Sequence, residues 1–167
     1  MEKIPQEKFE IRRDLKPGDI GYLIYLHGKL YAKEYKYDQS FEVYVAHGLI
    51  QFVHSFNAYR DRIWLAEANG RIIGSVAIAR TSKTEAQLRW FLVHPDHRGK
   101  GLGKQLISEA LNFCRDRKYK SVFLWTTSEL AAAGHLYMQA GFRKTEVKSH
   151  QVWGKFISEE KYTLNLD

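Results

Sequence analysis

One stretch, HPDHRGKGLGKQLISEAL at residues 94–111, constrains the fold more than any other part of the sequence. It lies between a predicted strand and a predicted helix, and it alternates glycines with basic residues. Glycines let backbone N–H groups approach a ligand closely, and a helix start adds unpaired N–H groups with a partial positive charge. The stretch predicts an anion-binding site, and a diphosphate is the ligand that suits it best. The alternative is a loop-to-helix turn with solvated basic side chains. Its glycines and basic residues are Arg98, Gly99, Lys100, Gly101, Gly103 and Lys104.

The elements on either side of this stretch are well marked. AQLRWFLV at 86–93 is typical of a strand, and residues 101–117 have the apolar spacing of an amphipathic helix. The apolar stripe of that helix consists of Leu102, Leu106, Ala110 and Cys114, widened by Ile107 and Leu111. Cys114, the single cysteine, is therefore expected in the core rather than as a nucleophile.

Upstream, the sequence predicts two helices and a hairpin. Residues 16–35 suit a helix that is interrupted or bent at Gly28, and residues 41–56 suit a second helix with Ser40 as its N-cap. Two apolar runs within 62–80 flank Asn69-Gly70, which is the strongest short-range signal for a hairpin.

Downstream, SVFLWT at 121–126 is an unbroken apolar run and predicts a strand buried on both faces. Ser128 is expected to cap a helix over 129–140 that Gly141 ends. KFEIRR at 8–13 predicts a first strand, and FRKTEVK at 142–148 and KYTLNL at 161–166 predict closing strands. The expected fold class is α/β (mixed α+β): a single domain over 1–167, with a mixed sheet and helices on its faces.

Composition narrows the partners. The chain has 167 residues with a formal charge of +7, which favours an anionic partner, but its basic residues form no dense tail and no reader helix is evident, so nucleic acid is unlikely as a partner. No apolar run of 18 residues exists, the N-terminal MEKIPQEKFEIRRD has no apolar signal core, and no His or Cys spacing indicates a metal. These features predict a cytoplasmic protein without a membrane partner or a metal.

Two nucleotide motifs fail in the glycine-rich stretch. A P-loop needs G-x-x-x-x-G-K-[ST], but Gly99 to Gly103 is one residue short and Gln105 replaces the hydroxyl residue. The dinucleotide fingerprint G-x-G-x-x-G fails because the glycines are at 99, 101 and 103.

A third signature fits. Residues 98–103, RGKGLG, match R/Q-x-x-G-x-G/A, the pyrophosphate signature of the GCN5-related N-acetyltransferase (GNAT) family, and AAAGHLYMQAGF at 131–142 resembles that family's A-x-x-x-L-Y-x-x-x-G-F segment. The resemblance extends from about Phe9 to Leu166, and its terminal portions resemble the acetyltransferase half of proteins that also carry a MarR-type DNA-binding domain. The 167 residues leave no room for that winged helix.

The resemblance implies a GNAT fold in which acetyl-CoA, a cosubstrate, lies between two splayed parallel strands, here 86–93 and 121–126. Backbone groups of Leu92 and Val93 would pair with the pantetheine, and N–H groups from Gly99 to Lys104 would hold the pyrophosphate. The cofactor-binding residues expected on this basis are Leu92, Val93, Arg98, Gly99, Lys100, Gly101, Leu102, Gly103, Lys104, Thr126 and Thr127.

The resemblance also implies which residue acts as the general acid of the reaction, while the general base stays open. Tyr137 matches the tyrosine that gives a proton to the departing thiolate in many relatives; the alternative is a core aromatic on one helical stripe. The general base stays open: Gln87 stands where some relatives have a glutamate, and Glu67, Glu85 and several histidines are candidates. Leu130 replaces an asparagine that many relatives place near the cofactor.

The resemblance implies that the acceptor is a primary amine of a small molecule or a protein. Its pocket is expected from the first two helices, the 86–93 strand and the C-terminal hairpin. Candidate lining residues are Tyr31, Tyr35, Gln87, Arg89 and Trp153, each of which is otherwise a core or surface residue. Arg89, on the same strand face as Gln87, would pair with a carboxylate of the acceptor or with an internal acid. Two further hypotheses stay open: a non-catalytic acetyl-CoA-binding regulatory domain of the same fold, and a homodimer joined through terminal strands.

Overall fold

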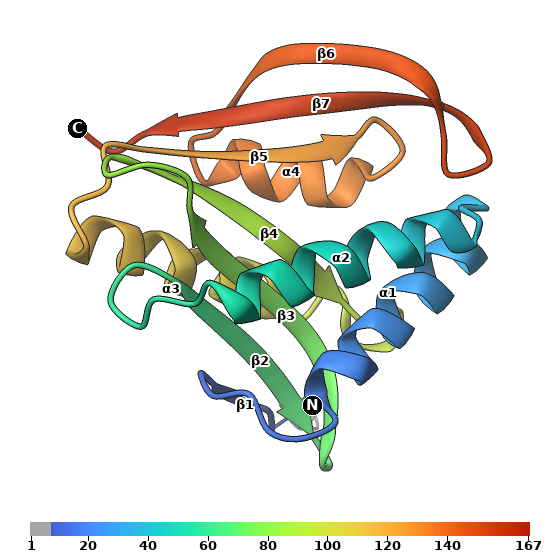
Figure 1. Cartoon of the computed structure of the whole chain (residues 1–167), viewed down its shortest axis with the longest axis horizontal. Helices are drawn as coiled ribbons and strands as arrows, with labels where there is room; N and C mark the ends of the chain where they lie inside the picture. Colours follow the sequence, from blue (N-terminus) through green and yellow to red (C-terminus); the bar gives the residue numbers. More distant parts are fainter. Residues whose placement is uncertain (1–7) are drawn as a thin grey trace, which may run out of the picture.

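The computed structural model describes residues 8–167 and contains a seven-stranded sheet in the order β1-β2-β3-β4-β5-β7-β6 (Figure 1). Neighbouring strands are antiparallel except β4 and β5, which are parallel. Residues 1–7, part of the segment read for a signal sequence, lie outside the described residues. The mixed sheet with helices confirms the predicted fold class. Its elements are β1 (Glu10–Arg12), α1 (Asp19–Tyr35), α2 (Gln39–His54), β2 (Arg62–Ala68), β3 (Arg71–Arg80), β4 (Glu85–Val93), the 3-10 turn η1 (Pro95–His97), α3 (Leu102–Asp116), β5 (Ser121–Thr127), α4 (Ala131–Gln139), β6 (Arg143–Val152) and β7 (Lys155–Asn165).

The helices cover the two faces of the sheet. On one face α1 and α2 pack on β2, β3 and β4 through a core that includes Leu23, Leu49 and Trp90. On the other face α3 and α4 pack through a larger core that includes Leu106 and Tyr137. Figure 1 shows α2 and α3 on opposite sides of β3, with the β6–β7 hairpin arching past α4. Among the described helices, none has the length and apolarity required to span a membrane.

Two tight hairpins organise the sheet, and the sequence predicted one of them. Asn69 and Gly70 join β2 to β3 with φ values of 52° and 73°, as expected for Asn-Gly. Trp153 and Gly154 join β6 to β7 with φ values of 53° and 83°, and this turn was missed because tryptophan is rarely left-handed. The β6–β7 strands are consequently longer than the predicted 142–148 and 161–166.

The expected interruption of the first helix at Gly28 is wrong. The helix α1 runs unbroken from Asp19 to Tyr35. A Cβ on Gly28 would lie 2.3 Å from Oε1 of Glu42 on α2. The glycine therefore permits close packing of two helices rather than ending one.

Two expected helix caps are also wrong. Asp38, not Ser40, is the N-cap of α2, and its carboxylate accepts from the Ser40 N–H at 2.9 Å. Ser128 does not cap α4, because its N–H donates to the Ser158 carbonyl of β7 and the helix begins only at Ala131. Gly141 follows the end of α4 with φ 100°, as predicted.

The strand β5 is not buried on both faces. Its burial alternates, with Val122 and Leu124 buried and Phe123 and Trp125 partly exposed. Lys161 lies 4.8 Å from the Phe123 ring and Lys148 lies 4.6 Å from the Trp125 ring. These aliphatic stems and cations cover the aromatic face, which explains why an outward-facing strand surface reads as apolar in the sequence.

Candidate functional site: two adjoining cavities at the split between β4 and β5

The parallel strands β4 and β5 separate along their length. They pair only at Glu85–Gln87 with Ser121–Phe123, and no strand pairing joins them beyond this point. Backbone groups of β4 after Gln87 therefore face a gap on their β5 side. Groups of this kind need polar partners, and an extended ligand can supply them.

A bulge bends β4 beside this gap. Ser75 of β3 pairs with Leu92 and Ala77 pairs with Arg89, so that Trp90 and Phe91 oppose the single residue Val76. Trp90 has a left-handed φ of 48°, and the Ser75 hydroxyl donates to its carbonyl at 2.6 Å. Bulges of this kind bend a strand and redirect the side chains next to it.

The glycine-rich stretch forms a bare helix start at the mouth of the gap. Gly99 and Gly101 have φ values of 76° and 86°, and Gly101 is the N-cap of α3 with no side-chain capping bond. The first N–H groups of α3 therefore have no partner within the helix. A Cβ on Gly103 would lie 3.0 Å from Cδ1 of Leu136 and 3.1 Å from Cζ of Phe91, so this glycine brings α3 close to α4 and β4.

The first cavity, called here the glycine-loop cleft, opens beside this helix start. It encloses about 950 Å³, including space open to solvent. The end of β4, the glycine-rich loop, the start of α3, α4 and the last turns of α1 form its walls. Its lining residues are Tyr31, Tyr35, Phe91, Leu92, Val93, His97, Arg98, Gly99, Leu102, Gly103, Leu130, Ala132, Ala133, His135 and Leu136.

Not all of the residues expected to hold the cofactor lie in this cleft. Leu92, Val93, Arg98, Gly99, Leu102 and Gly103 line it, whereas Gly101 and Lys104 line a shallow groove on the other side of the α3 start. Lys100 lies in the same loop and lines neither. Thr126 and Thr127 line the second cavity instead.

Arg98 is already engaged in a way that the sequence did not indicate. Its guanidinium forms two bonds to the carboxylate of Glu34 on α1, at 2.7 and 2.8 Å, and Nε donates to the Val93 carbonyl at 3.0 Å. The bond to Glu34 raises the pKa of Arg98, with burial acting in the opposite direction. The guanidinium is thus positioned at the cleft wall but shares its charge with a carboxylate.

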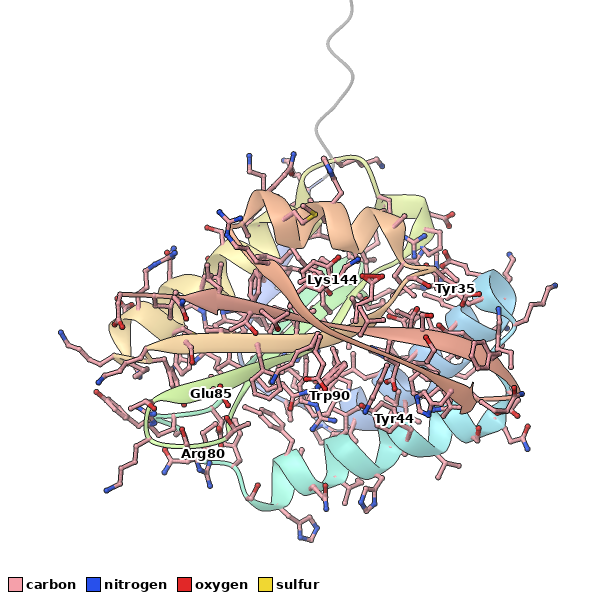
Figure 2. All side chains as sticks on the ribbon, turned by 90° about the horizontal axis from the view of Figure 1, so that it is seen from above. Tyr35, Tyr44, Arg80, Glu85, Trp90 and Lys144 are labelled. Carbon is pink, nitrogen blue, oxygen red and sulfur yellow. The ribbon has the colours of Figure 1, made fainter. Side chains whose placement is uncertain are left out.

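The second cavity, called here the aromatic pocket, adjoins the first, and Tyr31, Phe91 and Leu130 line both. It encloses about 670 Å³, including space open to solvent, and α1, α2, β4, β5, β7 and the β6–β7 turn form its walls. Its lining residues are His27, Tyr31, Tyr37, Phe41, Tyr44, Val45, Leu88, Arg89, Trp90, Phe91, Leu124, Trp125, Thr126, Thr127, Leu130, Tyr137, Trp153 and Glu159. Figure 2 shows Tyr44 and Trp90 together under the β6–β7 hairpin, whereas Arg80 and Glu85 lie at the opposite end of the sheet from Tyr35.

The tip of the β6–β7 hairpin closes this pocket against the α1–α2 corner. The Trp153 ring lies 4.9 Å from the Phe41 ring and 5.2 Å from the Tyr37 ring, measured between centroids. The Asp38 N–H donates to the Trp153 carbonyl at 3.0 Å, and the Tyr37 hydroxyl bonds to Oγ1 of Thr127 at 2.9 Å. Segments more than 100 residues apart in the chain therefore form one wall.

The predicted acceptor residues separate into three places. Tyr31 lines both cavities, Trp153 lines the aromatic pocket, and Arg89 lines the aromatic pocket and a shallow groove along α2. Tyr35 lines only the glycine-loop cleft. Gln87 lines the same groove along α2 and neither of the two cavities.

Tyr137 of α4 belongs to the larger core, on the α3 and α4 face of the sheet. Its side chain is 5% exposed, it lines the aromatic pocket, and its ring is 5.7 Å from the ring of Phe91, which lines both cavities. No hydrogen bond to its hydroxyl occurs among residues 8–167. Burial raises the pKa of this hydroxyl well above its usual range, so it keeps its proton at neutral pH.

Sequence reasoning missed His27, which lines the aromatic pocket and is 2% exposed. Nδ1 of its ring lies 2.8 Å from the Leu23 carbonyl, so Nδ1 carries the proton, while buried Nε2 has no partner among the described residues. Burial lowers the pKa of His27 to about 4, which keeps the ring neutral. His27 lies on the apolar stripe of α1 with Leu23 and Leu30, so the sequence pattern indicates a core position and gives no sign of a pocket residue.

The carboxylates considered as a base lie away from both cavities. Glu67 pairs with Arg12 at 2.8 Å, and Glu85 is at the closed end of the β4–β5 pair. Within residues 8–167, no cluster of three His, Cys, Asp or Glu side chains has a geometry that would hold a metal ion. Cys114 is buried in the core, and burial raises its thiol pKa to about 12, in agreement with the structural role predicted for it.

Comparison with known proteins agrees with this geometry. The acetyltransferase (GNAT) family model matches residues 27–142. Human N-acetyltransferase 8B is 33% identical over 99 residues, which cover 56% of this chain and 44% of that protein. An uncharacterised N-acetyltransferase of Methanocaldococcus jannaschii is 34% identical over 93 residues, covering 52% of this chain and 41% of that protein. The matched stretch thus spans less than half the length of these curated relatives.

Solved structures show the same fold. A GNAT-family acetyltransferase of Staphylococcus aureus superposes with a TM-score of 0.77 at 19% identity, covering 96% of this chain and 100% of that one. A putative acetyltransferase of Salmonella typhimurium, solved with its cofactor acetyl-CoA, superposes with a TM-score of 0.71 at 21% identity, covering 95% and 94%. Because the family model matches most of the chain and the split between β4 and β5 lies within the match, the protein belongs to the GNAT family of acetyltransferases.

Proposed function

We propose that this protein is an N-acetyltransferase that transfers the acetyl group of acetyl-CoA to a primary amine of a small molecule or a protein. The observation that carries the proposal is the meeting of two cavities where β4 and β5 separate, with the bare start of α3 at the outer end of one. A transferase needs separate entrances for a donor and an acceptor, and this arrangement supplies both.

The glycine-loop cleft suits acetyl-CoA. The unpaired N–H groups at the α3 start suit a diphosphate, as helix N-termini generally do, and Arg98 and Lys104 add positive charge. The backbone of Leu92 and Val93 borders the gap and offers amide partners to pantetheine. The acetyl group would then lie near Tyr31 and Phe91, where the cleft meets the aromatic pocket.

The proposed reaction is direct attack. The neutral amine nitrogen bonds to the thioester carbonyl carbon, the carbon–sulfur bond breaks, the sulfur leaves with the electron pair, and the nitrogen releases a proton to a base or to water. We assign no residue as this base. Backbone N–H groups near Val93, at the end of the bulged strand β4, are the proposed donors to the thioester carbonyl oxygen.

Tyr137 is the proposed general acid that protonates the departing thiolate. Its buried hydroxyl has no competing partner among residues 8–167, and its raised pKa keeps it protonated. The same burial disfavours a free thiolate, because desolvation raises the pKa of a thiol too. Burial thus raises both the pKa of the Tyr137 hydroxyl and the pKa of the CoA thiol. Proton transfer from the hydroxyl to the thiolate therefore stays accessible.

The first experiment is calorimetric binding of acetyl-CoA and of acetyl-pantetheine, which lacks the diphosphate. We expect acetyl-CoA to bind at micromolar Kd and acetyl-pantetheine at least about 100-fold more weakly, since charge-assisted bonds to the diphosphate carry much of the affinity. Lys104→Glu should weaken acetyl-CoA binding about tenfold. Lys83→Glu makes the same charge change at the opposite end of β4 and should leave Kd unchanged.

Failure of the folded wild type to bind acetyl-CoA would remove the proposal. Binding without turnover of any amine in a panel of amino acids, polyamines and peptides would instead favour the non-catalytic regulatory domain. The homodimer, the cytoplasmic location and the link to MarR fusion proteins stay predictions from the sequence.

A further inference from the structure

Arg89, in the middle of β4, lines both the aromatic pocket and the adjoining groove along α2, so its cation lies at the border between them. Its guanidinium carbon lies 4.3 Å from the centre of the Trp90 ring, the ring labelled beside Tyr44 in Figure 2. A Cβ on Gly48 of α2 would lie 2.7 Å from Nη2 of Arg89. The absence of a side chain at Gly48 therefore makes the room in which this guanidinium lies.

This guanidinium has no polar partner among residues 8–167: no carboxylate, carbonyl or hydroxyl accepts from it. The groove along α2, which Arg89 and Gly48 also line, contains one carboxylate, Asp61, and that carboxylate is already paired with Arg80. Other partly buried arginines differ from Arg89: Arg60 donates to the carbonyls of Arg117 and Lys83, and Arg62, which has no hydrogen bond among residues 8–167, lines neither cavity. A guanidinium carries five donors, so Arg89 retains its full capacity for a planar anion.

The other residues of the aromatic pocket restrict which kind of molecule can bring an anion to Arg89. Apart from Arg89, the charged residue that lines the pocket is Glu159, which already bonds to Nε2 of His150 at 2.5 Å. The walls are otherwise dominated by aromatic rings, including those of Tyr37, Phe41 and Trp153. Flat apolar walls bind an aromatic or bulky apolar body, and a guanidinium fork fits a carboxylate bidentately.

We propose that the acceptor is an amine that also carries a carboxylate on an aromatic or bulky apolar body, that is, an amino-acid-like small molecule whose carboxylate Arg89 binds. This inference rests on the proposed function. Arg89 lines the aromatic pocket and not the glycine-loop cleft, which separates its role from that of the diphosphate site. A protein lysine, flanked by neutral amides, leaves the guanidinium without its anion and is the alternative outcome.

The test measures product binding, because acetylated products have no titrating amine and differ only in the carboxylate. In the presence of CoA, the Kd values of N-acetyl-L-phenylalanine, its amide and N-acetylphenethylamine are measured by calorimetry. The matched leucine and isoamylamine products repeat the comparison on an aliphatic body. We expect the wild type to bind each carboxylate at least about tenfold more tightly than its uncharged partner, as a bidentate charged pair provides.

Arg89→Gln should abolish this preference, and Arg89→Lys, which keeps the charge without the fork, should retain part of it. Arg62→Gln is the matched control: Arg62 is also partly buried, also lacks a hydrogen-bond partner among the described residues, and lines neither cavity. The Arg62→Gln variant should prefer carboxylate products over uncharged ones as strongly as the wild type does. Acetyl-CoA affinity and the thermal midpoint should stay the same in the Arg89 variants.

Equal binding of charged and uncharged products by the wild type, or no binding of either, overturns the inference, as does a preference that survives in Arg89→Gln. Acetylation of peptide lysines in place of amino acids overturns it too. Loss of acetyl-CoA binding by the wild type itself would mark a failure of the proposed function instead, so the two failures are distinguishable.

Discussion

The two cavities differ in how the chain builds them. Most of the glycine-loop cleft comes from one continuous segment, from Phe91 to Gly103, completed by α4 and the end of α1. The aromatic pocket draws on α1, α2, β4, β5, β7 and the β6–β7 turn, which are distant in sequence. A backbone-built anion site can be encoded locally, whereas a pocket made of side chains depends on tertiary packing.

They also differ in how they satisfy polar groups. The cleft presents backbone N–H groups at a helix start. These groups suit a diphosphate, which every molecule of one cofactor class carries. The aromatic pocket presents side-chain groups that have no polar partner among residues 8–167, and these include Arg89, His27, Thr126 and Tyr137. Under the proposed function we expect those side chains to determine specificity, because an unpaired polar group is costly when the wrong ligand is bound.

The largest effect should come from Tyr137→Phe, in the aromatic pocket next to Phe91, which lines both cavities. Loss of the hydroxyl removes the proposed proton donor, and general acids contribute roughly 100-fold or more, so kcat should fall at least about 100-fold. Acetyl-CoA Kd and folding stability should stay near wild type. Tyr162→Phe is the control, because its ring lies 6.0 Å from that of Tyr137 and undergoes the same chemical change. Equal kcat values for both variants would exclude Tyr137 as the acid.

Trp153→Ala should affect the aromatic pocket and leave the cleft intact. The ring packs on Phe41, Tyr37 and Tyr44, and its loss should lower the free energy of unfolding by about 2–3 kcal/mol, measured in urea. Acceptor KM should rise and acetyl-CoA Kd should not change. Phe156→Ala on the same hairpin should cost little, because that side chain is 67% exposed. A parallel loss of cofactor affinity would show that the two cavities are not independent.

His27 predicts a pH dependence of stability. Its folded pKa of about 4 lies below the unfolded value of 6.5, so the unfolded chain binds the proton more readily and stability falls as pH falls from 6.5 toward 4. Between pH 7 and pH 5 this residue should account for about 2 kcal/mol of lost unfolding free energy. His27→Gln should reduce that slope, whereas His47→Gln, an exposed position on α2, should not. An unchanged slope in His27→Gln would place the dependence elsewhere.

The smallest effect should come from Glu34→Gln in the cleft. Removing the carboxylate frees the Arg98 guanidinium for the diphosphate, so acetyl-CoA should bind about threefold more tightly. Glu146→Gln, an exposed change on β6, serves as the control for net charge. Weaker binding in Glu34→Gln would mean that the ion pair positions Arg98 for the cofactor rather than competing with it.

Local sequence signals predicted much of the fold. Asn69-Gly70 favours a left-handed turn at both residues, and the apolar stripe of 101–117 predicts the buried face of α3, because both signals act over a few residues. The errors occurred where distant contacts decided the outcome. Gly28 looks like a helix break until Glu42 occupies the space beside it, and Ser128 looks like a cap until β7 takes its N–H.

The sequence by itself determined the glycine-rich loop with its uncapped helix start, the order of elements and the family, because glycine conformations, helix starts and periodicity are properties of neighbouring residues. Only the tertiary structure decided the aromatic pocket: that Trp153 closes it, that Gln87 lies outside it, that His27 is buried in it and that Arg89 has no polar partner among residues 8–167. The physical reason is that burial and pairing depend on which distant surfaces meet. No local pattern carries that information.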